Sequence, residues 1–201
     1  METRHKDGEH DWHSDAYVDE WMAKDLEREK KRRPLLAKMM ALAPFKSTDA
    51  IRILDVAGGY GAVSEAALAA FPKAKLTIHD YSSIMLERAR KHFAGGIGPI
   101  AYVQGDLTDP TWTQRIGGPF DLIVSGIAIH NLDDLKLIVN CYRAIHSLLV
   151  PGGVFLNCDH FGRSGGIEAN LDALKNVGFV EVSCPWQERL SGISTATRKA
   201  A

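Results

Sequence analysis

From residue 51 onward the chain alternates short apolar runs with helical stretches, and this alternation constrains the fold more than any other feature. The apolar runs lie at residues 51–56, 75–79, 100–104, 120–126 and 154–158. Strands and helices in regular succession predict a parallel sheet that helices cover on both faces. We therefore expect an α/β fold with a doubly wound, mostly parallel seven-stranded sheet. Residues 179–183 and 193–197 should form a final antiparallel pair.

The first 46 residues have a different pattern. Apolar side chains recur at spacings of three and four between residues 15 and 43, which predicts helices. We expect Pro34 to begin a second helix, because its fixed φ suits a first turn. The sequence thus divides into an N-terminal helical extension or lid at 1–46 and a Rossmann-like domain at 47–201.

Charge and composition narrow the class of partner. The 201 residues carry a formal net charge of −1, so no long-range field favours a polyanion, and a nucleic-acid partner is not expected. One basic run, at residues 28–33, is interleaved with Glu27 and Glu29. It reads either as a solvated helix face or as a rim that attracts an anionic substrate.

Three cysteines, Cys141, Cys158 and Cys184, show no paired spacing. We therefore expect neither a disulfide framework nor a metal site. The polar start of the chain predicts no signal peptide, and no apolar run is long enough to span a membrane. A cytoplasmic location is the resulting expectation.

The turn after the first strand, at residues 55–61, is rich in glycine. Glycines let a backbone turn tightly and approach a ligand closely, but dinucleotide enzymes use the same architecture. Two details argue against a dinucleotide. The turn lacks the third glycine of that fingerprint, and Asp55 would face a pyrophosphate unfavourably. An acid at Asp55 could instead accept hydrogen bonds from the ammonium of an amino-acid moiety.

Acids also follow the second and third strands. Asp80 stands where an acid accepts hydrogen bonds from ribose hydroxyls, and Asp106 could accept from an adenine amino group. A single aspartate after a strand is ordinary turn chemistry. Three acids at three successive strand ends, on the side where ligands bind, indicate an adenosyl ligand.

At this point the chain resembles the class I S-adenosylmethionine-dependent methyltransferases, over about residues 51–199. The resemblance rests on five segments in the family's order, at residues 53–61, 78–82, 104–107, 120–125 and 148–153. It departs from the family at Ala57, where glycine is usual. The resemblance implies S-adenosyl-L-methionine as cofactor, with S-adenosyl-L-homocysteine as its product.

The resemblance also implies a set of cofactor contacts. The turn should surround the methionine part, Asp80 should hold the ribose, and Ser125 should lie nearby where the fourth strand ends. Met85 could equally be plain core packing. The implied cofactor residues are Asp55, Ala57, Gly58, Gly59, Gly61, Asp80, Tyr81, Met85, Asp106, Leu107 and Ser125.

In proteins of this type, the segment after the fourth strand lies beside the transferred methyl group. His130 in that segment is therefore our first candidate for a general base, although it could only cap or orient the following helix. Asp159 and His160, at the end of the fifth strand, are further candidates. Neighbours on a strand point to opposite faces, so we expect one of the two to line the pocket rather than both to form a dyad.

The segment after the fifth strand is too short to form the inserted lid that many small-molecule methyltransferases carry. We expect the N-terminal helices to cover the site through His13, Tyr17 and Trp21, with Trp12 beside them, unless these rings merely pack the extension against the sheet. Trp186, between the last two strands, could complete the rim. The missing lid also leaves room for a second copy of the chain, as in a homodimer.

Absent motifs narrow the acceptor. Neither the Asn-Pro-Pro-Tyr type of motif nor a cysteine follows the fourth strand, and no magnesium-binding set of acids is evident. We therefore expect metal-free, in-line methyl transfer to a small molecule, with an oxygen or sulfur acceptor favoured. The alternatives are an RNA-modifying methyltransferase, a catalytically silent cofactor-binding module and, more distantly, an NAD-dependent oxidoreductase.

Overall fold

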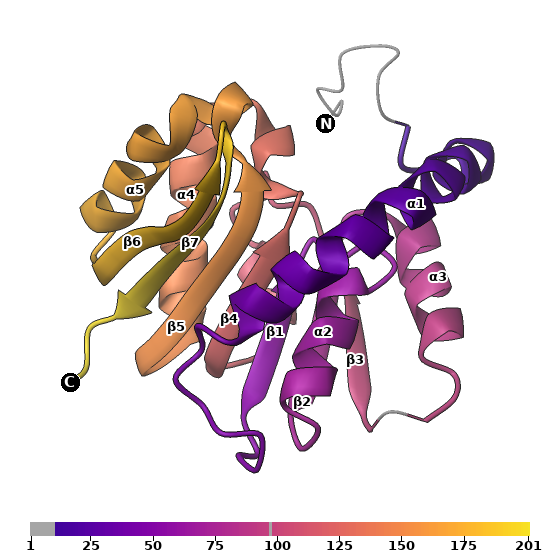
Figure 1. The fold of residues 1–201 in the computed structure, drawn as a ribbon, viewed down its shortest axis with the longest axis horizontal. Helices are drawn as coiled ribbons and strands as arrows, with labels where there is room; N and C mark the ends of the chain where they lie inside the picture. Colours follow the sequence, from indigo (N-terminus) through magenta and orange to yellow (C-terminus); the bar gives the residue numbers. More distant parts are fainter. Residues whose placement is uncertain (1–10, 97) are drawn as a thin grey trace.

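The computed structural model describes residues 11–96 and 98–201, and the first ten residues of the predicted extension lie outside it. Figure 1 shows a central sheet with helices on both sides. The strands are β1 (Arg52–Val56), β2 (Lys75–Asp80), β3 (Ile100–Gln104), β4 (Phe120–Gly126), β5 (Leu149–His160), β6 (Phe179–Glu188) and β7 (Ser191–Arg198). The α-helices are α1 (Asp15–Met40), α2 (Ala62–Ala70), α3 (Ser83–His92), α4 (Leu135–Leu148) and α5 (Gly166–Asn176).

The sheet confirms the predicted fold class. Its strand order is β3-β2-β1-β4-β5-β7-β6, with β1 to β5 parallel and β7 antiparallel to both of its neighbours. Strand order reverses between β1 and β4, and open α/β sheets bind ligands beyond the carboxyl ends of their strands at such a point. We call the edge where β1, β2, β4 and β5 end the carboxyl edge.

Two apolar cores flank the sheet because successive side chains of a buried strand point to opposite faces. In β1, Ile53 packs in the core beneath α1, α2 and α3, whereas Leu54 packs in the core beneath α4. The side chains of Ile53 and Leu54 are both fully buried. Continuously apolar strands are therefore what a sheet covered on both faces requires.

The N-terminal region is one helix, which corrects the expectation that Pro34 begins a second one. Helix α1 runs without interruption from Ser14, whose side chain caps it, to Met40, and Pro34 lies inside it. A proline within a helix removes its own hydrogen bond to the preceding turn. Leu36, Met39 and Met40 follow it on the buried side, so core packing holds the helix together. In Figure 1, α1 lies diagonally across the face that α2 and α3 also cover.

Three further boundaries differ from the sequence expectation. The predicted helix 133–149 begins at Leu135, after the short 3₁₀ helix η2 (Ile129–Leu132). Two other 3₁₀ helices are η1 (Trp112–Arg115) and η3 (Phe161–Ser164). The last two strands are longer than the predicted 179–183 and 193–197, so Trp186 lies within β6 and not between the strands.

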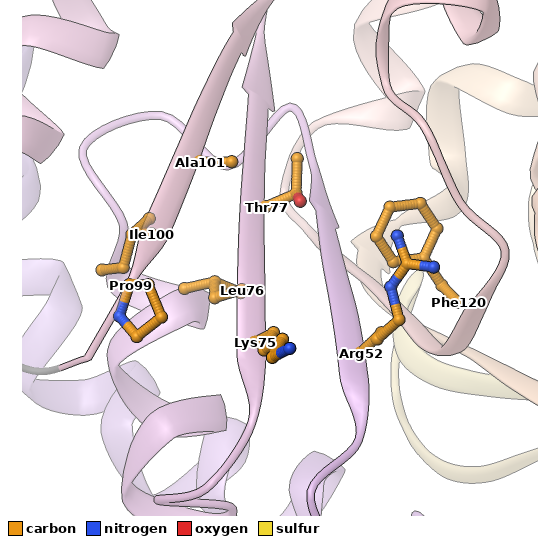
Figure 2. A pocket seen from close by; sticks show the side chains of 8 residues that line it. All are labelled: Arg52, Lys75, Leu76, Thr77, Pro99, Ile100, Ala101 and Phe120. Atoms are coloured by element: carbon orange, nitrogen blue, oxygen red, sulfur yellow. The ribbon is translucent and has the colours of Figure 1, made fainter.

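Two pockets lie away from the carboxyl edge. One, of about 290 Å³, lies where β1 to β4 begin, between Arg52, Lys75 and Phe120 (Figure 2). Another, of about 470 Å³, is a groove between α1 and α2. Within the described residues, no helix is both long and apolar enough to cross a membrane.

Candidate active site at the carboxyl edge

The turn between β1 and α2 has little room for side chains. A Cβ atom added to Gly58 would lie 2.7 Å from Cγ of Asp55, and one added to Gly61 would lie 2.4 Å from the ring of Phe93. Gly59 and Gly61 also adopt positive φ angles of 57° and 101°. The glycines predicted to surround a ligand thus fill a turn that larger residues could not adopt.

Ala57 adopts a φ of 53°, in the left-handed region that favours glycine. The residue at which the sequence departs from the family is therefore one where the backbone is strained. Its side chain is only a methyl group, which keeps the steric cost small compared with that of a branched residue.

Asp55 has a free acceptor inside this turn. The carboxyl group is fully buried, and its Oδ2 accepts a hydrogen bond of 2.6 Å from Ser64 Oγ. Among the described residues, Oδ1 has no partner. Burial raises the pKa of Asp55 to about 7, and the nearby charge of Asp80 adds to that effect while the Ser64 hydrogen bond opposes it. A buried, unpaired carboxylate oxygen fits a cationic donor such as the ammonium of an amino acid.

Asp80 ties two loops together at the end of β2. Its Oδ2 accepts from the N–H of Gly59 and its Oδ1 from the N–H of Ser82, both at 2.8 Å. Burial raises the pKa of Asp80 to about 6 although these backbone hydrogen bonds lower it. The carboxyl group predicted for the ribose therefore also sets the shape of the glycine turn.

The other predicted cofactor residues are arranged around this edge. Met85 is buried with Tyr60 and Val18, and the ring of Tyr81 lies 4.4 Å from the ring of His13. Asp106 is half-buried and accepts from Thr108, and Leu107 follows it against the core beneath α4. Ser125 is buried and donates to the carbonyl of Val56 at 2.9 Å, so its hydroxyl joins β4 to β1.

The structure brings His130 and Asp159 together. Nδ1 of His130 lies 2.5 Å from Oδ1 of Asp159, and the backbone N–H of His130 donates to Oδ2 at 3.1 Å. Their side chains are 11% and 2% exposed, so the histidine keeps one edge toward solvent while the acid is buried. From the sequence we argued against a dyad of Asp159 with His160 and did not consider a pair of Asp159 with His130. The side chain of Asp134, and not His130, caps α4.

The backbone before His130 is also unusual. Ile127 adopts a φ of 54°, and its N–H donates to the carbonyl of Cys158 at 2.8 Å. A β-branched residue in the left-handed region is strained, and such positions often lie at functional sites. This turn carries the chain from β4 into η2 and places His130 above the end of β5.

His160 is a neighbour of this pair and not its partner. Nδ1 of His160 lies 2.5 Å from Oγ of Ser191, and its ring centre lies 5.8 Å from that of His130. Burial lowers the pKa of His160, the charges of His130 and Arg32 lower it further, and the charge of Asp159 opposes them. His160 therefore lies beside the His130–Asp159 pair with its Nδ1 engaged by Ser191.

The aromatic side chains of the N-terminal segment lie over the glycine turn. Trp12 contacts Trp21 and Tyr17 with ring centres 5.2 and 5.3 Å apart, and Trp21 lies 6.4 Å from Tyr60. Ser82 Oγ donates to the carbonyl of Trp12 at 2.5 Å. Trp186 lies apart from this group, with Nζ of Lys38 6.0 Å above its ring.

From the sequence we did not single out Asp25 of α1, and we considered Arg32 only as part of the basic run at residues 28–33. Asp25 is 2% exposed, and it accepts hydrogen bonds from Arg32 and, at 3.1 Å, from the hydroxyl of Tyr60. Asp25 and Arg32 are seven residues apart, which places both on the helix face that carries Val18 and Leu36. This spacing is a sequence signal that could have revealed the pair. Among the described residues, no group of three or more His, Cys, Asp or Glu side chains could hold a metal ion.

Comparison with known proteins shows the family of this chain. A family model described as "Methyltransferase domain" matches residues 53–153. The chain is 34% identical over 88 residues to the release factor glutamine methyltransferase of Chlorobaculum tepidum, covering 43% of this chain and 30% of that protein. It is 35% identical over 126 residues to the ubiquinone/menaquinone biosynthesis C-methyltransferase of Methylobacterium nodulans, covering 60% of this chain and 46% of that protein. It thus spans less than half the length of these curated relatives.

Solved structures share the fold at low sequence identity. An O-methyltransferase family protein from Burkholderia thailandensis matches with a TM-score of 0.74 and 15% identity, over 94% of this chain and 62% of that one. Human N-acetylserotonin methyltransferase in complex with S-adenosylmethionine matches with a TM-score of 0.69 and 19% identity, over 94% and 58%. The family match covers the glycine turn and all strands from β1 to β4, and the chain belongs to the S-adenosylmethionine-dependent methyltransferases with a Rossmann-like fold.

Proposed function

We propose that this protein transfers a methyl group from S-adenosylmethionine to a small-molecule acceptor, with oxygen or sulfur as the acceptor atom. The observation that carries the proposal is the His130–Asp159 pair, which stands at the carboxyl edge beside the family's cofactor turn. The curated relatives include methyltransferases named for quinone biosynthesis and for malonyl-acyl carrier protein. Those names support an acceptor other than nucleic acid.

The residues of the turn fit the cofactor. The unpaired Oδ1 of Asp55 would accept from the ammonium of the methionine part, and the glycines would let the backbone approach it. Asp80, Tyr81, Met85, Asp106 and Leu107 would hold the adenosine, with Ser125 beneath. When bound, S-adenosylmethionine supplies an electrophilic methyl group on a sulfonium.

His130 would act as general base toward the acceptor. Asp159 accepts from Nδ1–H, which fixes the tautomer and leaves Nε2 free to take the proton of a hydroxyl or thiol. The proton then stays on Nε2, where the buried carboxylate of Asp159 stabilises the imidazolium. His160 would orient the acceptor through hydrogen bonding.

Exclusion of water is the proposed role of α1 and of the residues just before it. The rings of Trp12, His13, Tyr17 and Trp21 gather over Tyr60 and Tyr81, at the cofactor turn and the end of β2. A dry site strengthens the electrostatic interactions within it and holds the reactants in line. We propose that residues 1–46 form a lid region and that Trp186 contacts its outer side.

We also propose that the protein forms a homodimer and is located in the cytoplasm. Its three free cysteines suit a reducing compartment.

Two measurements test the proposal. Calorimetric titration with S-adenosylhomocysteine should show binding, and labelled S-adenosylmethionine should transfer its methyl group to members of a hydroxyl and thiol panel. His130→Ala should reduce transfer by about 10²–10⁴-fold while retaining cofactor affinity. His146→Gln, on α4 at the opposite face, serves as the control. Binding without transfer and without an effect of His130→Ala would indicate a silent cofactor-binding module instead.

A further inference from the structure

The basic run of α1 separates into outward and inward residues. Lys30 pairs with Glu27 at 2.8 Å and Arg33 pairs with Glu29 at 2.6 Å, and the side chains of Lys30 and Arg33 are 70% and 61% exposed. The side chain of Arg32 is 19% exposed. One arginine of the run therefore turns toward the protein while its neighbours form a solvated face.

Arg32 is held at the cofactor turn. Its Nη2 donates to Oδ2 of Asp25, and the same oxygen accepts from the hydroxyl of Tyr60, which belongs to the glycine turn. Asp25 is more deeply buried than Arg32. The guanidinium of Arg32, and not the carboxylate of Asp25, therefore lies on the more exposed side of the pair. A guanidinium carries five N–H donors in a planar fork, and this contact uses only one of its nitrogens.

Arg32 also acts electrostatically on residues of β5. Helix α1 packs against β5, and the positive charge of Arg32 helps to lower the pKa of His160. It also opposes the rise of the pKa of Cys158 that burial causes. Arg32 is thus joined to the glycine turn through Asp25 and Tyr60, on a helix that packs against the strand carrying Asp159 and His160. The carboxylate of Asp159 is already engaged by His130 and does not compete for the guanidinium.

We propose that Arg32 binds an anionic group of the methyl acceptor, so that the acceptor is a small molecule with a carboxylate or similar oxyanion besides the atom that is methylated. The proposal rests on the proposed function and names its substrate class. A guanidinium matches a carboxylate through two parallel hydrogen bonds, which adds orientation to attraction. Arg32 would then set the distance between the anionic group and His130.

Binding to the cofactor-loaded protein tests this without requiring turnover. The S-adenosylhomocysteine complex is titrated with 4-hydroxybenzoate, 3-hydroxybutyrate and mercaptoacetate. The affinity for each acid is compared with the affinity for the corresponding amide. At least one acid should bind tenfold or more tightly than its amide to the wild type and to Arg33→Gln. Arg32→Gln should bind acid and amide equally, and Arg32→Lys should fall between because lysine lacks the planar fork.

Cofactor affinity and thermal unfolding check that each variant keeps its fold. If Arg32→Gln does not fold, the acid-over-amide preference of Arg32→Lys is compared with that of the wild type instead. Equal affinity of wild type for every acid and its amide would overturn the proposal. So would an acid preference that persists in both Arg32 variants. Acid binding without methyl transfer would retain the anion site and reject the proposed activity, so the two failures are distinguishable.

Discussion

Nδ1 of His130 lies 2.5 Å from Oδ1 of Asp159, although 29 residues separate them in the sequence. The contact depends on strand register, because Gly126 at the end of β4 pairs with Cys158 in β5. Asp159 therefore emerges beside the turn that leads to His130. A buried acid that accepts from one ring nitrogen leaves the other available for chemistry, and this relationship leads to the first prediction.

Asp159→Asn should reduce kcat by about 10²–10⁴-fold, because the amide can no longer both fix the tautomer of His130 and stabilise its positive charge. The affinity for S-adenosylhomocysteine should change less than about threefold. Labelled methyl transfer and calorimetry measure the two effects. Asp133→Asn, at an exposed residue that pairs with Arg163, is the matched control. Equal losses in the two variants would argue against a special role for Asp159.

Asp55→Asn should weaken S-adenosylhomocysteine binding about ten- to a hundredfold, since it removes the charge that faces the ammonium. Because burial raises the pKa of Asp55 to about 7, wild-type affinity should increase as pH rises from about 6 to 8. That pH dependence should vanish in the variant. Asp172→Asn, on the exposed surface of α5, is the control and should retain it.

The same group affects the stability of the unliganded protein. The folded pKa of Asp55 lies above its ordinary value of 3.8, so its contribution to stability is complete below pH 3.8 and is lost as pH rises through about 7. Unliganded Asp55→Asn should therefore lose less stability than wild type between pH 5 and 8. Urea unfolding across this range measures the difference, and parallel curves would contradict the buried-acid explanation.

His79 should have the opposite pH dependence. It is fully buried against Trp112, with ring centres 4.9 Å apart, and neither ring nitrogen has a partner among the described residues. Burial lowers its pKa to about 4. A folded pKa below the ordinary 6.5 means stability that is complete above pH 6.5 and is lost as pH falls through 4. The loss reaches about 3 kcal/mol for that difference of pKa.

His79→Leu should thus flatten the acid limb of the stability curve between pH 6.5 and 4. Chemical unfolding at pH 7 and pH 4.5 gives the comparison, with His92→Gln, at a more exposed position on α3, as the control. An unchanged acid limb in His79→Leu would mean that other groups cause acid unfolding.

The sequence predicted most of the parallel half of the fold because its signals are local. Strands β1 and β4 are short, mostly apolar runs, and the turn from Asp55 to Gly61 is a contiguous motif. The His130–Asp159 contact has no local signal, since it follows from the pairing of two strands. The rule that strand neighbours point to opposite faces predicted only that one of Asp159 and His160 would line the pocket.

Helix α1 and strand β6 show two other limits of predicting the structure from the sequence. Pro34 is a local signal for a helix start, but packing of Leu36 and Met39 against the sheet prevails over it. Strand β6 contains Pro185 and shows register shifts, both of which an edge strand tolerates. These irregularities interrupt the alternation of apolar and polar residues, so the sequence predicted a shorter strand. Asp25 was not considered in the sequence analysis, although its spacing of seven residues from Arg32 places both on one helix face.

Ala57→Gly should stabilise the protein, although most glycine substitutions destabilise. Ala57 has a φ of 53°, and the left-handed conformation costs a residue with a side chain roughly 1–2 kcal/mol. Glycine avoids that cost but loses about 0.4–1 kcal/mol through its freer unfolded chain. The balance should be a gain of about 0.5 kcal/mol in the free energy of unfolding.

Chemical unfolding of Ala57→Gly and Ala69→Gly gives the decisive comparison. Ala69 is exposed in α2, where glycine should cost about 1 kcal/mol because the helix restricts it. The two substitutions remove the same methyl group, so opposite signs would isolate the backbone conformation as the cause. The methyl group of Ala57 should not contribute to cofactor binding, so S-adenosylhomocysteine affinity should stay within about twofold. A loss of stability in Ala57→Gly would mean that its methyl group packs more favourably than its φ angle costs.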